Sequence, residues 1–231
     1  MEKPSLDTAK AGAMRFNTDS SQMEIYDGNQ WTGILATSPF QQTGGTRGLW
    51  AGRNSPHTDA IDFVTIEITG NASDFGNLVT NTGIACAMSS RIRGVIAGGT
   101  APNDSGNSDK MDFVTIASTG NATDFGNLIT ARHGCMGLGD STRGLIIGGR
   151  TPSRLNSIEY ITIAATGNAQ DFGDVDYTNG MRASGAFSSP TRGVFAGGAD
   201  SPGNNAVNII HFVTLASTGC LLYTSPSPRD S

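Results

Sequence analysis

The stretch "MDFVTIASTGNATDFGNL" at residues 111–128 decides the fold, because the chain repeats it. Close copies read "IDFVTIEITGNASDFGNL" at 61–78 and "IEYITIAATGNAQDFGDV" at 158–175, and "IIHFVTLASTG" at 209–219 begins a fourth. A phrase that recurs every 20–50 residues is typical of solenoids, propellers and other arrays, in which one unit cannot bury its apolar faces alone. The phrase therefore indicates a repeat architecture rather than a catalytic motif.

An Arg-Gly pair and an apolar run ending in glycine precede each copy. The runs are "TRGLWAGR" at 46–53, "IRGVIAGG" at 92–99, "TRGLIIGG" at 142–149 and "TRGVFAGG" at 191–198. Short Val/Ile/Phe-rich runs bounded by Gly are typical of strands. Each unit then carries a variable polar loop, a second apolar run, the Asp-Phe-Gly phrase and a closing small-residue segment. We therefore expect about four units of four strands, starting near residues 46, 92, 142 and 191.

Composition supports an all-β chain. The 231 residues include 31 glycines, only 15% are charged, and no amphipathic helical run of convincing length is present. The net charge of −5 gives no basic footprint, so nucleic acid is not an expected partner. No apolar run approaches the roughly 18 residues of a membrane-spanning helix, so we expect no membrane insertion.

The Asp-Phe-Gly triplets match a kinase motif in letters only, because no glycine-rich loop, strand lysine or His-Arg-Asp segment accompanies them. We predict that they form corners of the repeat, where Phe packs between units and Asp caps backbone amides or meets an arginine. The Asn-Ala-Ser and Asn-Ala-Thr triplets match the N-glycosylation signal only because the same phrase is repeated. The predicted corner residues are Asp74, Asp124 and Asp171 with Phe75, Phe125 and Phe172.

Residues 43–219 resemble the kelch repeat. The shared features are an apolar strand ending in Gly-Gly, a variable loop and then an aromatic-bearing strand with Phe63, Phe113, Tyr160 or Phe212. The resemblance implies a kelch-like β-propeller, here truncated. Kelch units usually carry a tryptophan late in the repeat, and this chain departs from that pattern with Phe75, Phe125 and Phe172 near that place. A β-solenoid is the alternative packing, although its rungs are shorter than about 46 residues.

The N-terminal residues 1–42 lie outside the repeat and predict a small β-hairpin module. Strands are expected at 14–16 and 23–26, with a hairpin turn at 27–29 and a third strand starting near Trp31. Its phrasing resembles a module of phage tail fibres, which are trimers, and the repeats resemble those of marine cyanophage tail-fibre proteins. The resemblance implies a virion appendage subunit, made in the host cytoplasm without a signal peptide, and a homotrimer. Tyr26 and Trp31 are either oligomer contacts or a plain hydrophobic hairpin face.

Residues 220–231, "CLLYTSPSPRDS", interrupt the fourth copy of the repeat. They resemble the translation of a sequencing adapter. We therefore expect a non-native tail on a fragment from environmental sequencing, and we leave it out of the fold prediction.

No residues in the sequence suggest catalysis, a metal or a cofactor. The histidines His57, His133 and His211 do not share a phase of the repeat, so no metal cluster is expected. No GxSxG, HExxH or Walker motif is present. The odd number of cysteines argues against a disulfide framework, so Cys86, Cys135 and Cys220 are interpreted as buried or half-buried thiols.

The recurring arginines allow two interpretations. Arg47, Arg93, Arg143 and Arg192 either form a cationic ring for an anionic sugar or phosphate, or bond carbonyls or a nearby Asp within the scaffold. Their regular repetition favours the structural role.

The variable loops after each Gly-Gly are the better candidates for binding, because equivalent loops of a propeller emerge on the same face. The candidate residues in these loops are His57, Asn103, Asp104, Arg154, Asn204 and Asn205. We expect a non-enzymatic protein that presents them to a host-surface glycan or protein beside other virion appendage subunits. The alternatives are a non-viral kelch-like interaction module and, least favoured, a propeller enzyme that processes glycans.

Overall fold

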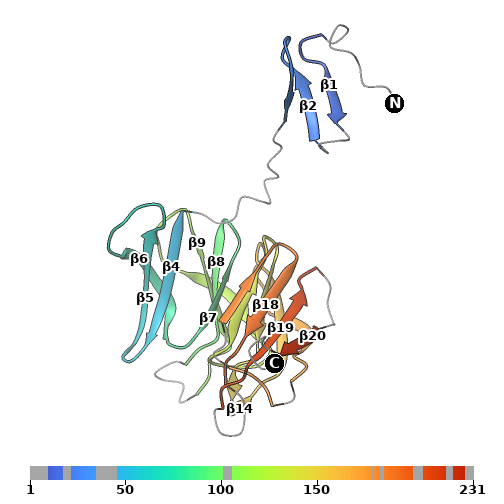
Figure 1. The fold of residues 1–231 in the computed structure, drawn as a ribbon. Coiled ribbons are helices and arrows are strands. Elements are labelled where there is room, and N and C mark those ends of the chain that lie inside the picture. The colour runs from blue at the N-terminus through green and yellow to red at the C-terminus, as the bar shows by residue number, and fades with distance from the viewer. Residues whose placement is uncertain are drawn as a thin grey trace. The chain divides into compact units, whose positions relative to one another are not determined.

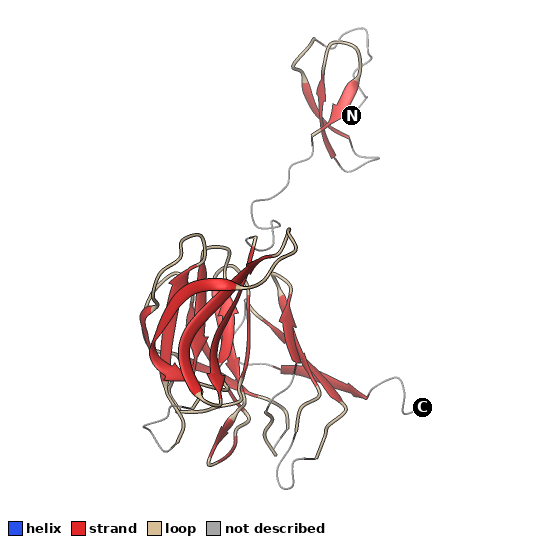
Figure 2. Ribbon diagram, turned by 90° about the vertical axis from the view of Figure 1, so that its left-hand side faces the viewer, coloured by secondary structure: helices blue, strands red, loops and turns tan. Residues whose placement is uncertain are grey.

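A computed structural model describes residues 10–17, 22–34, 46–100, 106–177, 179–182, 185–199, 205–216 and 221–226, the last range and Gln22 as backbone only. The chain divides into two compact units, Met1–Gln42 and Thr43–Ser231. The described residues form antiparallel sheets and loops without a helix, so the predicted all-β class is confirmed (Figure 2). Accordingly, no described segment is a helix long and apolar enough to cross a membrane.

The N-terminal unit is an antiparallel sheet of β1 (Met14–Asn17), β2 (Gln22–Tyr26) and β3 (Trp31–Gly33), as the sequence predicted. Asp27 shapes the hairpin between β2 and β3, because its carboxylate accepts hydrogen bonds of 2.8 Å from the backbone N–H groups of Asn29 and Gln30. Strand register then decides which side chains share a face.

The two faces of this small sheet differ. On one face Arg15 lies 4.2 Å over the Trp31 ring and bonds Glu24 at 2.7 Å, while Tyr26 packs on Trp31. Tyr26 and Trp31 therefore contact each other within the module. The opposite face is apolar and exposed, and it carries Met14, Phe16, Met23, Ile25 and Ile34.

The C-terminal unit contains four successive sheets of one topology, in which the strands follow chain order (Figure 1). The first sheet is β4 (Arg47–Asn54), β5 (His57–Thr65) and β6 (Ser73–Thr82). The second is β7 (Cys86–Ser89), β8 (Arg93–Ala97), β9 (Lys110–Thr115) and β10 (Thr123–Asn127). The third is β11 (Met136–Gly139), β12 (Arg143–Ile147), β15 (Ser157–Thr162) and β16 (Gln170–Asp174). The fourth is β17 (Gly185–Ser188), β18 (Arg192–Ala196), β19 (Ile209–Thr214) and β20 (Leu221–Pro226). A short hairpin, β13 (Arg150–Thr151) and β14 (Ser153–Arg154), lies in a loop of the third sheet.

The second, third and fourth sheets begin one strand earlier than the sequence units, whereas the first sheet has three strands and begins at its Arg-Gly strand. The small-residue segment that was expected to close a unit instead pairs with the Arg-Gly strand of the next, as β7 does with β8 and β11 with β12. Glycine lets these first strands approach closely: a Cβ on Gly137 of β11 would lie 2.2 Å from the Ala87 carbonyl oxygen of β7. The small residues of this segment therefore reflect packing between sheets.

The Asp-Phe-Gly triplets lie within strands, so the predicted corners are wrong. Each triplet sits in the last strand of its sheet, and the register shifts at its Phe, which faces no partner residue. A β-bulge of this kind bends the strand and redirects a side chain. Phe75, Phe125 and Phe172 are each at most 3% exposed as a result.

The redirected Phe side chains build the core between neighbouring sheets. Phe75 packs with Val114 of the second sheet, and Phe125 packs with Ile161 and Ile163 of the third. Phe172 lies in one cluster with residues of the fourth sheet. Burial of a large apolar side chain contributes about 1.5–3 kcal/mol, so each sheet depends on its neighbour for stability.

The segment excluded from the fold prediction contributes a strand. Leu221–Pro226 pairs antiparallel with β19 and occupies the edge that an Asp-Phe-Gly strand fills in the other sheets. Ladder hydrogen bonds join backbone groups, so an open edge can pair with an extended segment of unrelated sequence.

Candidate binding face and the junctions that support it

The Thr-Gly-Asn-Ala phrase of the second sheet docks on the Asp-Phe-Gly-Asn strand of the first sheet. Gly120 N–H donates to Phe75 O at 2.8 Å, and the Asn121 side chain accepts from Asn77 N–H at 3.0 Å. The third sheet repeats both bonds through Gly167 and Asn168. The phrase is therefore a connector between sheets.

Glycine is required in the docked strand. Gly76 has φ +149°, and a Cβ there would lie 2.3 Å from the Gly120 carbonyl oxygen. Gly126 is in the same position relative to Gly167, at 2.4 Å. Any side chain would separate the two sheets, which explains the invariant third letter of Asp-Phe-Gly.

The recurring arginines bond carbonyl groups across the same junctions. The guanidinium groups of Arg47, Arg93 and Arg143 stack at 4.2–4.8 Å on an aromatic ring of the strand that follows in their own sheet, which is β5, β9 or β15. They donate to the carbonyl oxygens of Ile116, Ile163 and Leu215 in the following sheet at 2.9, 3.0 and 2.6 Å. Arg192 makes the stack, on Phe212 at 4.6 Å, and no hydrogen bond to a described residue. This geometry is that of scaffold residues. Asp74, Asp124 and Asp171 are exposed, and none of them forms a hydrogen bond or ion pair with these arginines.

An acidic residue in the third strand makes a further junction bond that the sequence analysis missed. Asp112 accepts from Val79 N–H at 3.0 Å, and Glu159 accepts from Ile129 N–H at 2.8 Å. Burial raises the pKa of the Asp112 carboxyl, and the charge of Asp124 adds to the effect. The available signal was an acid embedded in an apolar strand, as in "MDFVTI" and "IEYITI".

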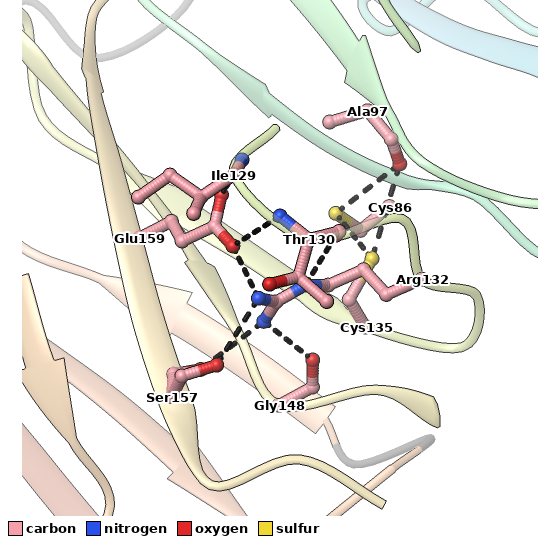
Figure 3. Close-up of polar contacts among 9 residues, drawn as sticks. All are labelled: Cys86, Ala97, Ile129, Thr130, Arg132, Cys135, Gly148, Ser157 and Glu159. Atoms are coloured by element: carbon pink, nitrogen blue, oxygen red, sulfur yellow. Dashed lines mark hydrogen bonds and ion pairs between the residues drawn. The ribbon is translucent and has the colours of Figure 1, made fainter. Parts of the chain in front are cut away.

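Arg132 completes the junction between the second and third sheets (Figure 3). It is fully buried and pairs with Glu159, and it also donates to Gly148 O at 2.9 Å and to the backbone and side chain of Ser157. Buried charges persist only when they are paired and hydrogen-bonded, as these are.

The variable loops of the second, third and fourth sheets start from equivalent anchors. The residue after each Gly-Gly exchanges two backbone hydrogen bonds with the residue that leads into the first strand of the same sheet, at N···O distances of 2.8–3.3 Å. The pairs are Gly83 with Thr100, His133 with Arg150, and Arg182 with Ala199. The three loops therefore leave the scaffold at equivalent places, which we call the loop end.

Three of the six predicted binding residues lie within the described residues. His57 begins β5, and its Nε2 lies 2.9 Å from Thr100 Oγ1 of the next sheet, so it links two loops. Arg154 ends the hairpin strand β14, and Asn205 is exposed at the base of the fourth loop. Asn103, Asp104 and Asn204 lie outside the described residues.

The structure adds a cationic patch of His133, Arg150 and Arg182 at the loop end. Gly134, beside His133, has side-chain atoms of Ile84 and Arg182 within 4 Å of where a Cβ would stand. Partial burial and the charges of Arg150 and Arg182 lower the pKa of His133. His133 also bonds the Asn107 side chain through Nδ1. The sequence analysis missed the patch because its members come from two loop anchors 49 residues apart and from the Gly-Gly run between them.

Within the described part of the chain, no group of three or more His, Cys, Asp or Glu side chains is placed to hold a metal ion. A search against protein-family models and a search of curated proteins both gave no match. The function must therefore be argued from the geometry of the chain itself.

Proposed function

We propose that this chain is a binding subunit of a virion appendage, such as a tail fibre, which presents the loop end of a kelch-like propeller to a host-surface glycan or protein. The observation that carries the proposal is the common anchoring of variable loops on a repeated scaffold. Rigid scaffolds with variable loops are how repeat proteins acquire ligands without changing their core. The role is non-enzymatic, because neither the motifs nor the described side chains suggest a reaction.

The propeller is the arrangement that best uses the junctions described above. The second and third sheets each offer a Thr-Gly-Asn-Ala connector on one side and an Asp-Phe-Gly edge on the other, so similar sheets stack in one direction. The first strands β7, β11 and β17 lie side by side, as the innermost strands of blades do. The kelch-like identity rests on this geometry and on the sequence resemblance.

The cationic patch points to a ligand with anionic groups. Arginine donors bind carboxylate, sulfate and phosphate oxygens in paired geometry. Uncharged hydroxyls would instead use loop residues such as Asn205. We therefore favour an acidic surface glycan, with weak single contacts multiplied by several copies of the subunit.

The apolar face of the N-terminal sheet supplies the multiple copies. A three-stranded sheet of this size does not hold a core by itself, and its exposed side chains Met14 and Phe16 are 66% and 57% exposed. Packing these faces together in a homotrimer would bury them.

Binding is tested with the full chain on an array of acidic and neutral glycans and on intact host cells. Arg150→Gln with Arg182→Gln is expected to lower binding to acidic glycans at least tenfold. The matched control is Arg91→Gln, an exposed arginine at the β7–β8 turn, the other end of the strands from the loop anchors. Equal binding by the two variants, or no binding of any glycan or cell by the parent chain, would refute the proposed site.

Self-association is tested by sedimentation equilibrium. The parent chain is expected to form trimers at micromolar concentration, and Phe16→Glu with Ile25→Glu is expected to give monomers. Gln30→Glu, in the exposed β2–β3 turn, keeps the charge change away from the apolar face and should leave the trimer intact. A monomeric parent chain would contradict the assembly.

A further inference from the structure

Two cysteines from different sheets meet in the core. Cys86 begins β7 of the second sheet, and Cys135 directly precedes β11 of the third. Their Sγ atoms lie 3.0 Å apart, although the residues are 49 positions apart in the sequence, and both side chains are buried (Figure 3). The two cysteines occupy different positions of the repeat, so their contact could not be predicted from the sequence.

The surroundings give neither thiol a strong alternative partner. Both lie in the apolar cluster that contains Met88, Val95 and Ile146. Their other polar contact is the Ala97 carbonyl oxygen, at 3.6 Å from Cys86 Sγ and 3.8 Å from Cys135 Sγ. Thiols are weak donors, so little hydrogen bonding is lost if both protons leave.

We propose that Cys86 and Cys135 form a disulfide that joins the second and third sheets under oxidising conditions. The two sulfurs face each other with no side chain between them, and only a small approach separates the contact from a bond. The bridge would close a loop of about fifty residues and add a covalent link to a junction that packing, the Arg132–Glu159 pair and hydrogen bonds such as that of Arg93 already hold.

The two thiols differ in access and in acidity. Cys86 lines a groove of about 280 Å³ between the first and second sheets, whose other walls include Leu49 and Ile61, so a small oxidant reaches Cys86 first. The Cys135 thiol has a lowered pKa, because Cys86 hydrogen-bonds to it and Arg132 contributes positive charge, whereas contact with Cys135 and burial raise the pKa of Cys86. Cys135 is therefore suited to the second step, the attack on an oxidised Cys86.

The oxidant is a small-molecule disulfide such as oxidised glutathione. Cys86 loses its proton to solvent and attacks one sulfur of the oxidant, which breaks the S–S bond, releases one thiolate and leaves a mixed disulfide on Cys86. The Cys135 thiolate then attacks the Cys86 sulfur, which releases the second thiolate. Two protein thiols are oxidised, one small disulfide is reduced to two thiols, and the two protons end on those thiols.

The test uses the full chain with Cys220→Ser, so that only the two buried thiols remain. The protein is incubated with oxidised glutathione in native buffer, denatured with a maleimide, and weighed by intact-mass spectrometry. The expected product is 2 Da lighter, carries no maleimide, and yields a tryptic cross-link between the peptides 54–91 and 133–143. The thermal midpoint should rise by about 5–15 °C on oxidation and return on reduction.

Cys86→Ser and Cys135→Ser, each combined with Cys220→Ser, are the controls and should show no rise in midpoint with oxidant. If either variant fails to fold, the mass measurement on the Cys220→Ser chain still decides the matter. Two maleimides on the oxidised chain, two glutathione adducts, or a cross-linked dimer in place of the internal bridge would each overturn the proposal.

Discussion

The first and third sheets share one sequence pattern but bury different parts of it. Trp50 and Ile146 occupy the same place in the Arg-Gly strand, yet Trp50 is 58% exposed and Ile146 is 0% exposed. Ile66 and Ile163 follow the equivalent strands β5 and β15, and they are 66% and 0% exposed. The repeat therefore encodes the faces of a sheet, and the neighbour decides whether those faces are buried.

The third sheet is buried because the second sheet covers it. Ile146 and Ile163 lie in one cluster with Phe125, the bulged residue of the second sheet. The described residues place no sheet ahead of the first. In such an array the free energy of unfolding is a sum of weak unit terms and strong junction terms, so substitutions at equivalent positions should have unequal effects.

The largest effect is expected at the charged junction between the second and third sheets. Arg132→Met should lower the free energy of unfolding by about 3–5 kcal/mol, because it leaves the Glu159 carboxylate buried without its cation. Urea denaturation followed by tryptophan fluorescence and circular dichroism measures it. Thr82 is the equivalent of Arg132 in the junction between the first and second sheets. Thr82→Val should lower the free energy of unfolding by roughly 1 kcal/mol.

The double variant Arg132→Met with Glu159→Met separates charge from packing. It should recover most of the lost stability, since no uncompensated charge remains. A loss as large as that of the single variant would mean that the hydrogen bonds of Arg132 to Gly148 and Ser157, and not its charge, hold the junction.

The difference between the first and third sheets is tested by replacing the equivalent isoleucine of each sheet with alanine. Ile163→Ala should cost about 2–5 kcal/mol, because it opens a cavity in the core between two sheets. Ile66→Ala should cost less than about 0.5 kcal/mol, because the side chain is already in water. Equal costs in urea denaturation would show that a further surface covers the first sheet in solution.

The repeat fixed the number of sheets and their order of strands, but not their boundaries. Arg-Gly and Gly-Gly mark strand ends because turns and close approaches require glycine, and these signals are local. The first strand of each sheet, such as "CAMS" at 86–89, carries no such signal, and its partner strand is known only from pairing. The sequence units were therefore one strand out of phase.

The candidate site was harder to predict than the fold. Variable loops can be recognised by their differences in length, so the sequence singled out His57 and Arg154 as candidates. The cationic patch of His133, Arg150 and Arg182 depends on which loop anchors pair across sheets, and Arg132 looks like an ordinary polar residue in "ITARHG". Such contacts follow from the geometry of the junctions, which cannot be predicted from a single sequence.

An intermediate effect is expected from the arginines. Arg143→Ala should cost about 1–2 kcal/mol, because it removes both the stack on Tyr160 and the bond to the Leu215 carbonyl. Arg192→Ala removes only the stack on Phe212 and should cost less than about 0.5 kcal/mol. Thermal and urea unfolding measure both. A larger cost for Arg192 would indicate that its guanidinium has a partner in solution.

The smallest effect concerns pH and compares the third and fourth sheets at one position. The third strand carries Glu159 in one and His211 in the other, where the imidazole is 1% exposed and stacks on Phe195 at 5.1 Å. Burial lowers the pKa of His211 below its ordinary 6.5, and the opposing charge of Asp176 only partly offsets this. The unfolded chain therefore binds the proton more tightly than the folded one, so this stability is complete above pH 6.5 and is lost as the pH falls through the lowered pKa.

The thermal midpoint of the parent chain should consequently fall between pH 8 and pH 5, and His211→Gln should reduce that fall. His133, whose pKa is lowered by partial burial and two arginines, contributes in the same direction, so His133→Gln is the matched comparison. The two variants should also differ in ligand binding, because only His133→Gln changes the cationic patch. If His211→Gln leaves the pH dependence unchanged, the proton that matters is bound elsewhere, and the fourth sheet meets the third through a junction unlike the others.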